Sequence, residues 1–89
     1  MKKPMVQPDD DNFGAVLICA VRYSIGRETY MPKLVQDFIR PLLPYLSNKT
    51  LYVIERDVSE ANSYGDKNID EPDWMRFLKA VRDEMNMRN

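Results

Sequence analysis

The segment from Arg22 to Pro32 holds the residues of this 89-residue chain that are best suited to binding chemistry. It places two arginines, two tyrosines and a glycine between two apolar stretches. A guanidinium group can bind a phosphate or a carboxylate through two parallel hydrogen bonds, and a tyrosine ring can stack on a planar group. The candidate ligand- or partner-binding residues are therefore Arg22, Tyr23, Arg27 and Tyr30, with Arg40 as one that could join them after folding.

The same cluster also has a purely structural interpretation. Arg22 lies near the C-terminal end of a predicted helix, where the helix dipole favours a cation. The tyrosines could bury their rings and keep their hydroxyl groups in water. Either Arg22 or Arg27 could form an ion pair that fastens two helices, with Glu28, Asp37 or Glu55 as the candidate partners.

Several chemistries are excluded by residue types that the chain lacks. It contains no histidine, which removes Ser-His-Asp and Cys-His catalysis and the usual zinc sites. Its single cysteine cannot complete a thiolate cage for zinc, and no glycine-rich phosphate loop occurs. We therefore expect no enzymatic activity, no cofactor and no metal site.

Two groups of acidic residues have spacings that invite comparison with metal and acid–base sites. Asp66, Asn68 and Asp70 match the first ligands of a calcium-binding EF-hand, but Glu71 and Phe77 replace the required glycine and glutamate. Members of the second group point in different directions around a helix, which favours solvent-facing ion pairs over catalysis or magnesium binding. This group comprises Glu55, Asp57 and Glu60, with Arg56 and Lys49 as the expected ion-pair partners.

Length and charge bound the architecture and the partners. Eighty-nine residues form one domain, and a domain this small is marginally stable unless something adds buried surface. We therefore expect a homo-oligomer. The formal net charge is −1 and charges of both signs alternate along the chain, which argues against nucleic-acid binding.

The sequence favours a cytoplasmic protein. Lys2 and Lys3 resemble the head of a signal peptide, but acidic residues follow where an apolar core would be needed. The longest apolar run, Phe13 to Val21, is far shorter than the roughly 20 residues that span a bilayer, so no membrane partner is expected. Cys19 lies in this run and cannot form an internal disulfide, which predicts a buried thiol in a reducing compartment.

Apolar periodicity predicts an all-α fold, with a flexible leader over residues 1–12 and one compact four-helix domain over residues 13–89. Capping residues at 10–12 precede the first helix, which should run toward Gly26. The second helix should carry Pro32 in its first turn. Its apolar positions are Met31, Leu34, Val35, Phe38 and Ile39, and those of the first helix are Phe13, Val16, Leu17, Ala20 and Val21.

Two prolines, Pro41 and Pro44, predict a broken joint after the second helix. Ser47 can then cap a third helix, and Pro72 with its acidic neighbours begins a fourth. Residues 15–21 and 51–55 would also suit strands, and periodicity alone leaves that alternative open. The apolar stripe of the fourth helix consists of Trp74, Phe77, Leu78, Val81 and Met85, and that of the third of Leu51, Ile54, Val58 and Ala61.

A set of short motifs runs through most of the chain, between residues 13 and 82. They include Arg22-Tyr23, Gly26-Arg27, Thr29-Tyr30-Met31-Pro32, Phe38-Ile39-Arg40-Pro41-Leu42-Leu43-Pro44, Lys49-Thr50-Leu51, Glu55-Arg56-Asp57, Tyr64-Gly65-Asp66 and Ile69-Asp70. In these motifs the chain resembles a family of short uncharacterised proteins of Firmicutes bacteriophages, prophages and conjugative elements. The resemblance implies a small cytosolic protein encoded by a mobile element, and it carries no catalytic residue with it.

Three hypotheses for function follow. The leading one is a phage or mobile-element binding protein that antagonises a bacterial defence system or host regulator by occupying a protein target. Its interface would be an exposed patch approaching roughly 800 Å² per side, with Tyr45, Tyr52 or methionines as candidate members. The second is an oligomeric sponge that encloses a nucleotide-like immune signal between Arg22, Arg27 and the tyrosines. The third, a structural or DNA-associated accessory protein, is disfavoured by the charge balance.

Overall fold

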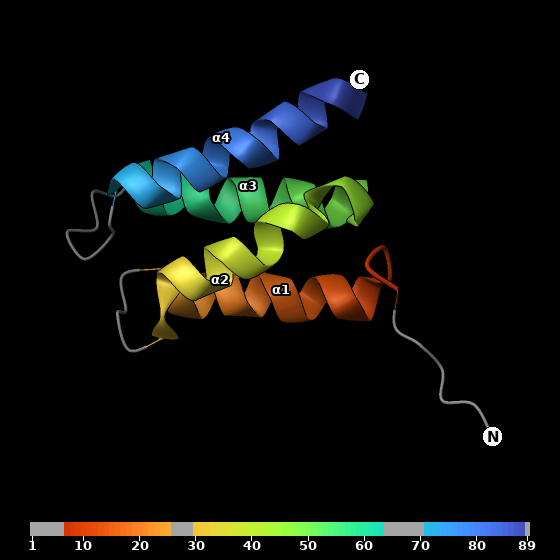
Figure 1. Cartoon of the computed structure of the whole chain (residues 1–89), viewed down its shortest axis with the longest axis horizontal. Helices are drawn as coiled ribbons and strands as arrows, with labels where there is room; N and C mark the ends of the chain where they lie inside the picture. The colour runs from red at the N-terminus through yellow and green to blue at the C-terminus, as the bar shows by residue number, and fades with distance from the viewer. Residues whose placement is uncertain (1–6, 26–29, 64–70, 89) are drawn as a thin grey trace.

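The computed structural model describes residues 7–25, 30–63 and 71–88. For residues 61–63 and 71 it describes the backbone alone. These segments contain four α-helices, one 3₁₀-helix and no strand (Figure 1). The prediction of a compact four-helix fold with a proline-broken joint is confirmed, and both 15–21 and 51–55 are helical. The elements are α1 (Asp11–Ser24), α2 (Pro32–Ile39), η2 (Arg40–Tyr45), α3 (Asn48–Ser63) and α4 (Glu71–Arg88).

Helix α1 begins where a side chain satisfies its first backbone donors. Asp10 is the N-cap, and its carboxylate accepts a hydrogen bond from the backbone N–H of Asn12 at 2.7 Å. The helix thus starts at Asp11, two residues before the expected domain boundary at residue 13. It ends at Ser24, and the expected stop at Gly26 lies outside the described residues.

The joint between α2 and α3 is a tight 3₁₀ turn that the end of α4 fastens in place. Pro41 and Pro44 both lie in η2, as the sequence predicts. The Arg88 guanidinium donates hydrogen bonds to the carbonyl oxygens of Leu43 at 3.0 Å and Pro44 at 3.1 Å. A second set of bonds from Arg88, to Asn48 at 2.8 Å and Glu84 at 3.0 Å, holds its side chain in that position.

Helix α3 has the predicted cap and makes the closest approach to another helix. The Ser47 hydroxyl accepts a hydrogen bond from the Thr50 backbone N–H at 3.2 Å and donates one to the Thr50 hydroxyl at 3.0 Å. Thr50 is buried against Gly14 of α1, so closely that a Cβ atom at Gly14 would overlap the Thr50 Oγ1. Glycine is therefore what allows α1 and α3 to cross at this point.

Helix α3 lies between α1 and α4, while α2 and η2 run across them (Figure 1). The arrangement is flat, with extents of 48 × 33 × 17 Å. Trp74 is the largest buried side chain, and it meets Phe77 edge to face with ring centroids 5.6 Å apart. The buried apolar residues are Leu17, Val21, Ile39, Leu43, Leu46, Leu51, Ile54, Val58, Trp74, Phe77, Leu78 and Val81.

Two of the predicted apolar stripes are only partly buried. On α2, Ile39 is buried, but Leu34 and Phe38 are each more than half exposed. On α1, Val16 is exposed while its neighbour Leu17 is in the core. Four of the predicted apolar positions of these two helices are therefore exposed: Val16, Met31, Leu34 and Phe38. The arrangement is flat, so the core covers only part of the circumference of α1 and α2.

Candidate functional site

Arg22 is held against α3 by an ion pair. Its Nε donates to Asp57 Oδ2 at 2.6 Å and its Nη2 to Asp57 Oδ1 at 3.4 Å. These hydrogen bonds, and then the attraction between the charges, raise the pKa of Arg22. Arg22 thus forms an ion pair between two helices, as the structural interpretation proposes. Its partner is Asp57 and not Glu28, Asp37 or Glu55, which the sequence suggested. Asp57 also lies 3.8 Å from Arg56, the partner that the sequence predicts for this acidic group.

Tyr23 and Tyr30 are the two members of the predicted cluster that the structure brings together. Their ring centroids are 6.0 Å apart, with the ring planes tilted by 43°. Both side chains are more than half exposed, so the expected burial of their rings does not occur. Successive residues of a helix point about 100° apart, which is why Tyr23 faces away from the ion pair that its neighbour Arg22 makes.

The other two predicted site residues do not add to this tyrosine pair. Arg27 lies outside the described residues. Arg40 begins η2 at the opposite end of α2 from Tyr30, and its side chain is exposed. Arg22 is occupied by Asp57, so the described part of the cluster presents aromatic rings without a converging pair of guanidinium groups.

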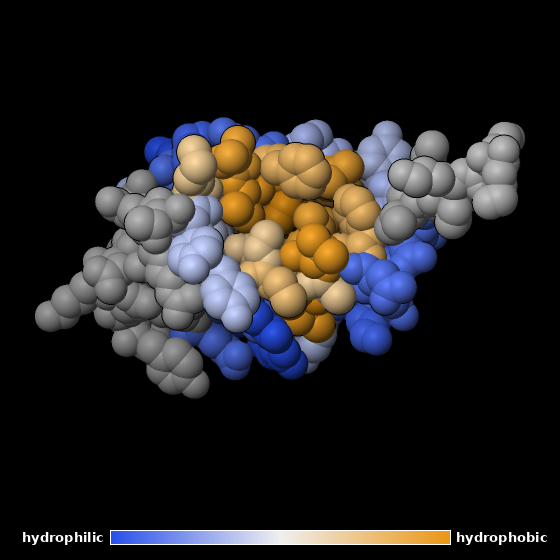
Figure 2. All heavy atoms as spheres, turned by 90° about the horizontal axis from the view of Figure 1, so that it is seen from below, coloured by the Kyte–Doolittle hydropathy of each residue, from blue (hydrophilic) through white to orange (hydrophobic). Residues whose placement is uncertain are grey.

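An apolar groove lies between α1 and α2 on the described surface. Figure 2 shows apolar side chains gathered in one patch on the side of the molecule that carries these helices. The groove has a volume of about 320 Å³. Val16 is 66% exposed, Leu34 59% and Phe38 58%. The lining residues, which define the α1–α2 groove, are Val16, Leu17, Ala20, Leu34, Val35, Phe38 and Ile39.

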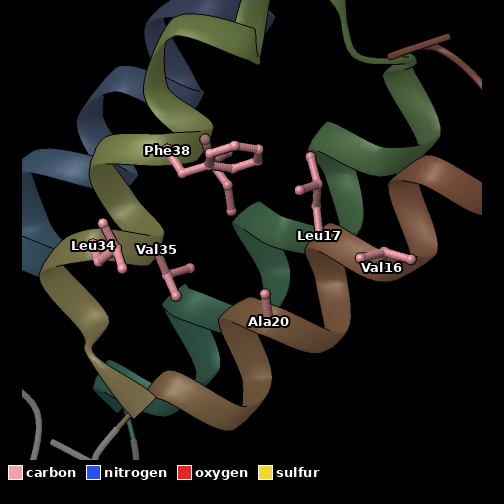
Figure 3. A pocket seen from close by; sticks show the side chains of 7 residues that line it. Val16, Leu17, Ala20, Leu34, Val35 and Phe38 are labelled. Atoms are coloured by element: carbon pink, nitrogen blue, oxygen red, sulfur yellow. The ribbon is translucent and has the colours of Figure 1, made fainter. Parts of the chain in front are cut away.

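Close up, the α1–α2 groove is a gap beside a small residue (Figure 3). The side chains of Val35 and Phe38 reach from α2 toward α1, and Leu17 reaches from α1 toward Phe38. Ala20 has only a methyl group at this point, so α1 leaves space that a longer side chain would fill. The surface therefore combines a recess beside Ala20 with the protruding ring of Phe38.

The solvent face of α1 carries no charge between Asp11 and Arg22. Ala15, Val16 and Cys19 are all exposed on it. The prediction of a buried Cys19 is therefore wrong, because this position of the apolar run faces outward. A helix that is apolar all round is normally buried on every side, and α1 is covered on only part of its circumference.

A second surface of different composition lies between α3 and α4, on the side of α3 away from α1. Two hollows of about 320 and 250 Å³ meet there, and Tyr52 and Met85 border both. Tyr52 is 56% exposed. The residues lining the hollows, which define the Tyr52 surface, are Asn48, Tyr52, Glu55, Arg82, Met85, Asn86 and Arg88.

Charged side chains on the Tyr52 surface are fixed by bonds within the chain. Arg82 pairs with Glu55 at 2.9 Å, and its guanidinium also lies 3.4 Å from the Ser59 hydroxyl. Arg88 pairs with Glu84 at 3.0 Å and bonds the η2 carbonyls. Both arginines thus keep defined positions beside Tyr52 before any partner arrives.

Neither a metal-ligand cluster nor a membrane-spanning helix occurs among the described residues. These residues hold no group of three or more acidic or cysteine side chains placed to share a metal ion. The EF-hand-like residues Asp66, Asn68 and Asp70 lie outside the described part of the chain. None of the described helices combines the length and the apolar character that a membrane span requires.

The sequence signals for the two surfaces differ in strength. The sequence indicates Tyr52 as a candidate interface residue, together with Tyr45 and the methionines. The α1–α2 groove was not predicted, since its residues were identified only as apolar positions of two helices. The signal that could have found it is the lack of charge around the whole of α1.

Comparison with known proteins gives no relative for this arrangement. No protein-family model, no curated protein and no solved structure matches the chain.

Proposed function

We propose that this chain is a non-enzymatic binding protein that occupies a folded protein target through the Tyr52 surface. The observation that supports the proposal is the makeup of this surface: an exposed tyrosine between two hollows, bordered by a methionine and two arginines. Aromatic residues, methionine and arginine are the types enriched where proteins bind one another, and tyrosine and arginine dominate the binding energy.

The fixed charges around Tyr52 favour binding of a partner by lowering its entropic cost. Ordering a long side chain at an interface costs about 0.5–1.5 kcal/mol. Arg82 and Arg88 are already ordered by Glu55 and by the η2 carbonyls, so little of that cost remains. Tyr52 can then act as the anchor that enters a pocket of the target, with the arginines at its rim.

The target that we propose is a bacterial host protein, either a component of a defence system or a regulator, that the chain inhibits by occupying it. The resemblance to small phage and mobile-element proteins supports this context. In the same proposal the protein acts in the host cytoplasm and as a homo-oligomer. A nucleotide-binding role is less well supported, because Arg22 is engaged by Asp57 and Arg40 lies at the opposite end of α2 from Tyr30.

A pull-down from host lysate with the purified protein tests the proposal. The bound fraction is analysed by protein and by nucleotide mass spectrometry. We expect a specific protein whose capture falls about 30-fold when Tyr52→Ala removes the anchor, the effect of about 2 kcal/mol at a hot spot. Tyr30→Ala is the matched control, since Tyr30 is 53% exposed and lies just before α2, outside the Tyr52 surface.

The two tyrosine variants separate the remaining outcomes. Loss of capture in Tyr30→Ala alone would move the binding site to the predicted arginine and tyrosine cluster. Recovery of a nucleotide and no protein would replace this proposal with the sponge hypothesis. Equal capture by the parent and both variants would show that neither surface binds the target.

A further inference from the structure

We infer that the α1–α2 groove is the interface between two copies of this chain. The inference rests on the proposed homo-oligomer and is independent of the proposed target, which binds on another surface. Each step depends on the composition, the charges and the exposed area of the described residues.

The composition of the α1–α2 groove is that of a permanent interface. Every residue that lines it is apolar, and α1 has no charge between Asp11 and Arg22. Interfaces of obligate homodimers are more apolar than those of transient complexes and are depleted in charge at their centre. The Tyr52 surface, with its two fixed arginines, has the mixed composition of a transient interface instead. A second copy is the one partner present whenever the chain is made.

The exposed area is of the size that such an interface needs. Tyr23 follows Ala20 by one turn of α1 and lies beside Tyr30, and Met31 is the N-cap of α2. Six exposed side chains together offer on the order of 600 Å², close to the roughly 800 Å² per partner of a standard interface. These six are Val16, Tyr23, Tyr30, Met31, Leu34 and Phe38, each more than half exposed.

Light scattering at micromolar concentration tests the interface. We expect a mass of twice the 10.5 kDa chain for the parent. Phe38→Glu and Val16→Lys each put a charge at the centre of the α1–α2 groove and should give monomers that remain helical by circular dichroism. Tyr52→Glu is the matched control on the other surface and should stay dimeric.

The native thiol gives a second, independent measurement. Cys19 lies one turn after Val16 on the uncharged face of α1 and is exposed in a single copy. Its reaction with a bulky maleimide should be at least about tenfold slower in the dimeric parent than in Phe38→Glu, because the second copy covers it. Equal rates in the two proteins would place the interface elsewhere and overturn the inference.

A parent protein that is monomeric at tens of micromolar, or a dimer that survives both groove variants, would overturn the interface itself, whatever the pull-down finds.

Discussion

At Gly14 the backbones of α1 and α3 come closer than a side chain there would allow. A Cβ atom would overlap the Thr50 Oγ1 and lie 3.2 Å from both Thr50 Cβ and Cγ2. Alanine is the better helix former by about 1 kcal/mol, but overpacking a tight contact costs about 1–3 kcal/mol. At this position the contact outweighs the helix propensity because Thr50 is buried and bonded to Ser47.

We therefore predict that Gly14→Ala destabilises the protein by about 1–2 kcal/mol, measured by urea denaturation. In a Thr50→Ala background, which lacks the overlapping Oγ1, the same change should be nearly neutral. The double-mutant cycle then gives a coupling energy of about 1 kcal/mol or more. Additive effects of the two substitutions would show that α1 and α3 do not meet through these residues.

Removing the ion pair between Arg22 and Asp57 distinguishes a structural role of Arg22 from a binding role. Arg22 is 52% exposed and Asp57 11%, so solvent screens much of the attraction. We predict that Arg22→Ala lowers stability by about 0.5–1 kcal/mol and the melting temperature by several degrees, while capture of a target is unchanged once the fraction of folded protein is considered. Circular dichroism melts and a binding titration measure these two quantities. A loss of capture with an unchanged melting temperature would contradict the prediction.

The sign of the pH dependence of this ion pair follows from the direction of its pKa shift. The pair raises the pKa of Arg22, so the guanidinium contribution is fully present below the ordinary pKa of arginine. This contribution is lost only as the pH rises through the higher pKa that Arg22 has in the folded state. Changing the pH between neutral and mildly alkaline should therefore leave the effect of Arg22→Ala unchanged.

Among the elements, α4 depends most on a single side chain. Trp74 is buried at the start of α4 and packs edge to face on Phe77. We predict that Trp74→Ala lowers the free energy of unfolding by about 3–5 kcal/mol, a large part of the stability of a small domain. The measurement is a denaturant titration, and a change of only a degree or two in melting temperature would contradict the assignment.

Trp74→Phe is the control for this prediction. The indole Nε1 is buried without a hydrogen-bond partner in the described structure, so phenylalanine removes an unsatisfied donor as well as some volume. It should therefore cost much less than alanine does. A loss as large as that of Trp74→Ala would mean that the indole makes a bond that the structure lacks.

The sequence predicted where helices lie better than which of their faces are covered. Local signals determine the elements: Ser47 caps α3, and the two prolines break the chain after α2. Burial depends on the packing of whole helices, so the period that placed Phe38 on an apolar stripe could not show that the stripe extends beyond the core. The pairing of Arg22 with Asp57 likewise depends on the crossing of α1 and α3, which no local pattern contains.

For the whole molecule, a dimer joined through α1 predicts a stability that depends on concentration. Because association favours the folded state by mass action, the melting temperature of the parent should rise by several degrees between about 1 and 100 μM. Phe38→Glu should melt at one temperature over the same range. Calorimetry at three concentrations measures both, and a concentration-independent parent would contradict the proposed interface.

The flat shape of the chain affects how its size can be measured. A body of 48 × 33 × 17 Å experiences more friction in water than a sphere of the same mass, and its radius of gyration of 13.2 Å exceeds the roughly 12 Å usual for this length. A single copy should therefore diffuse slowly for its mass and elute early from a sizing column, where it imitates a larger particle. Two plates joined along their α1 edges would lengthen the outline further, so elution position overstates both species and only an absolute mass distinguishes one copy from two.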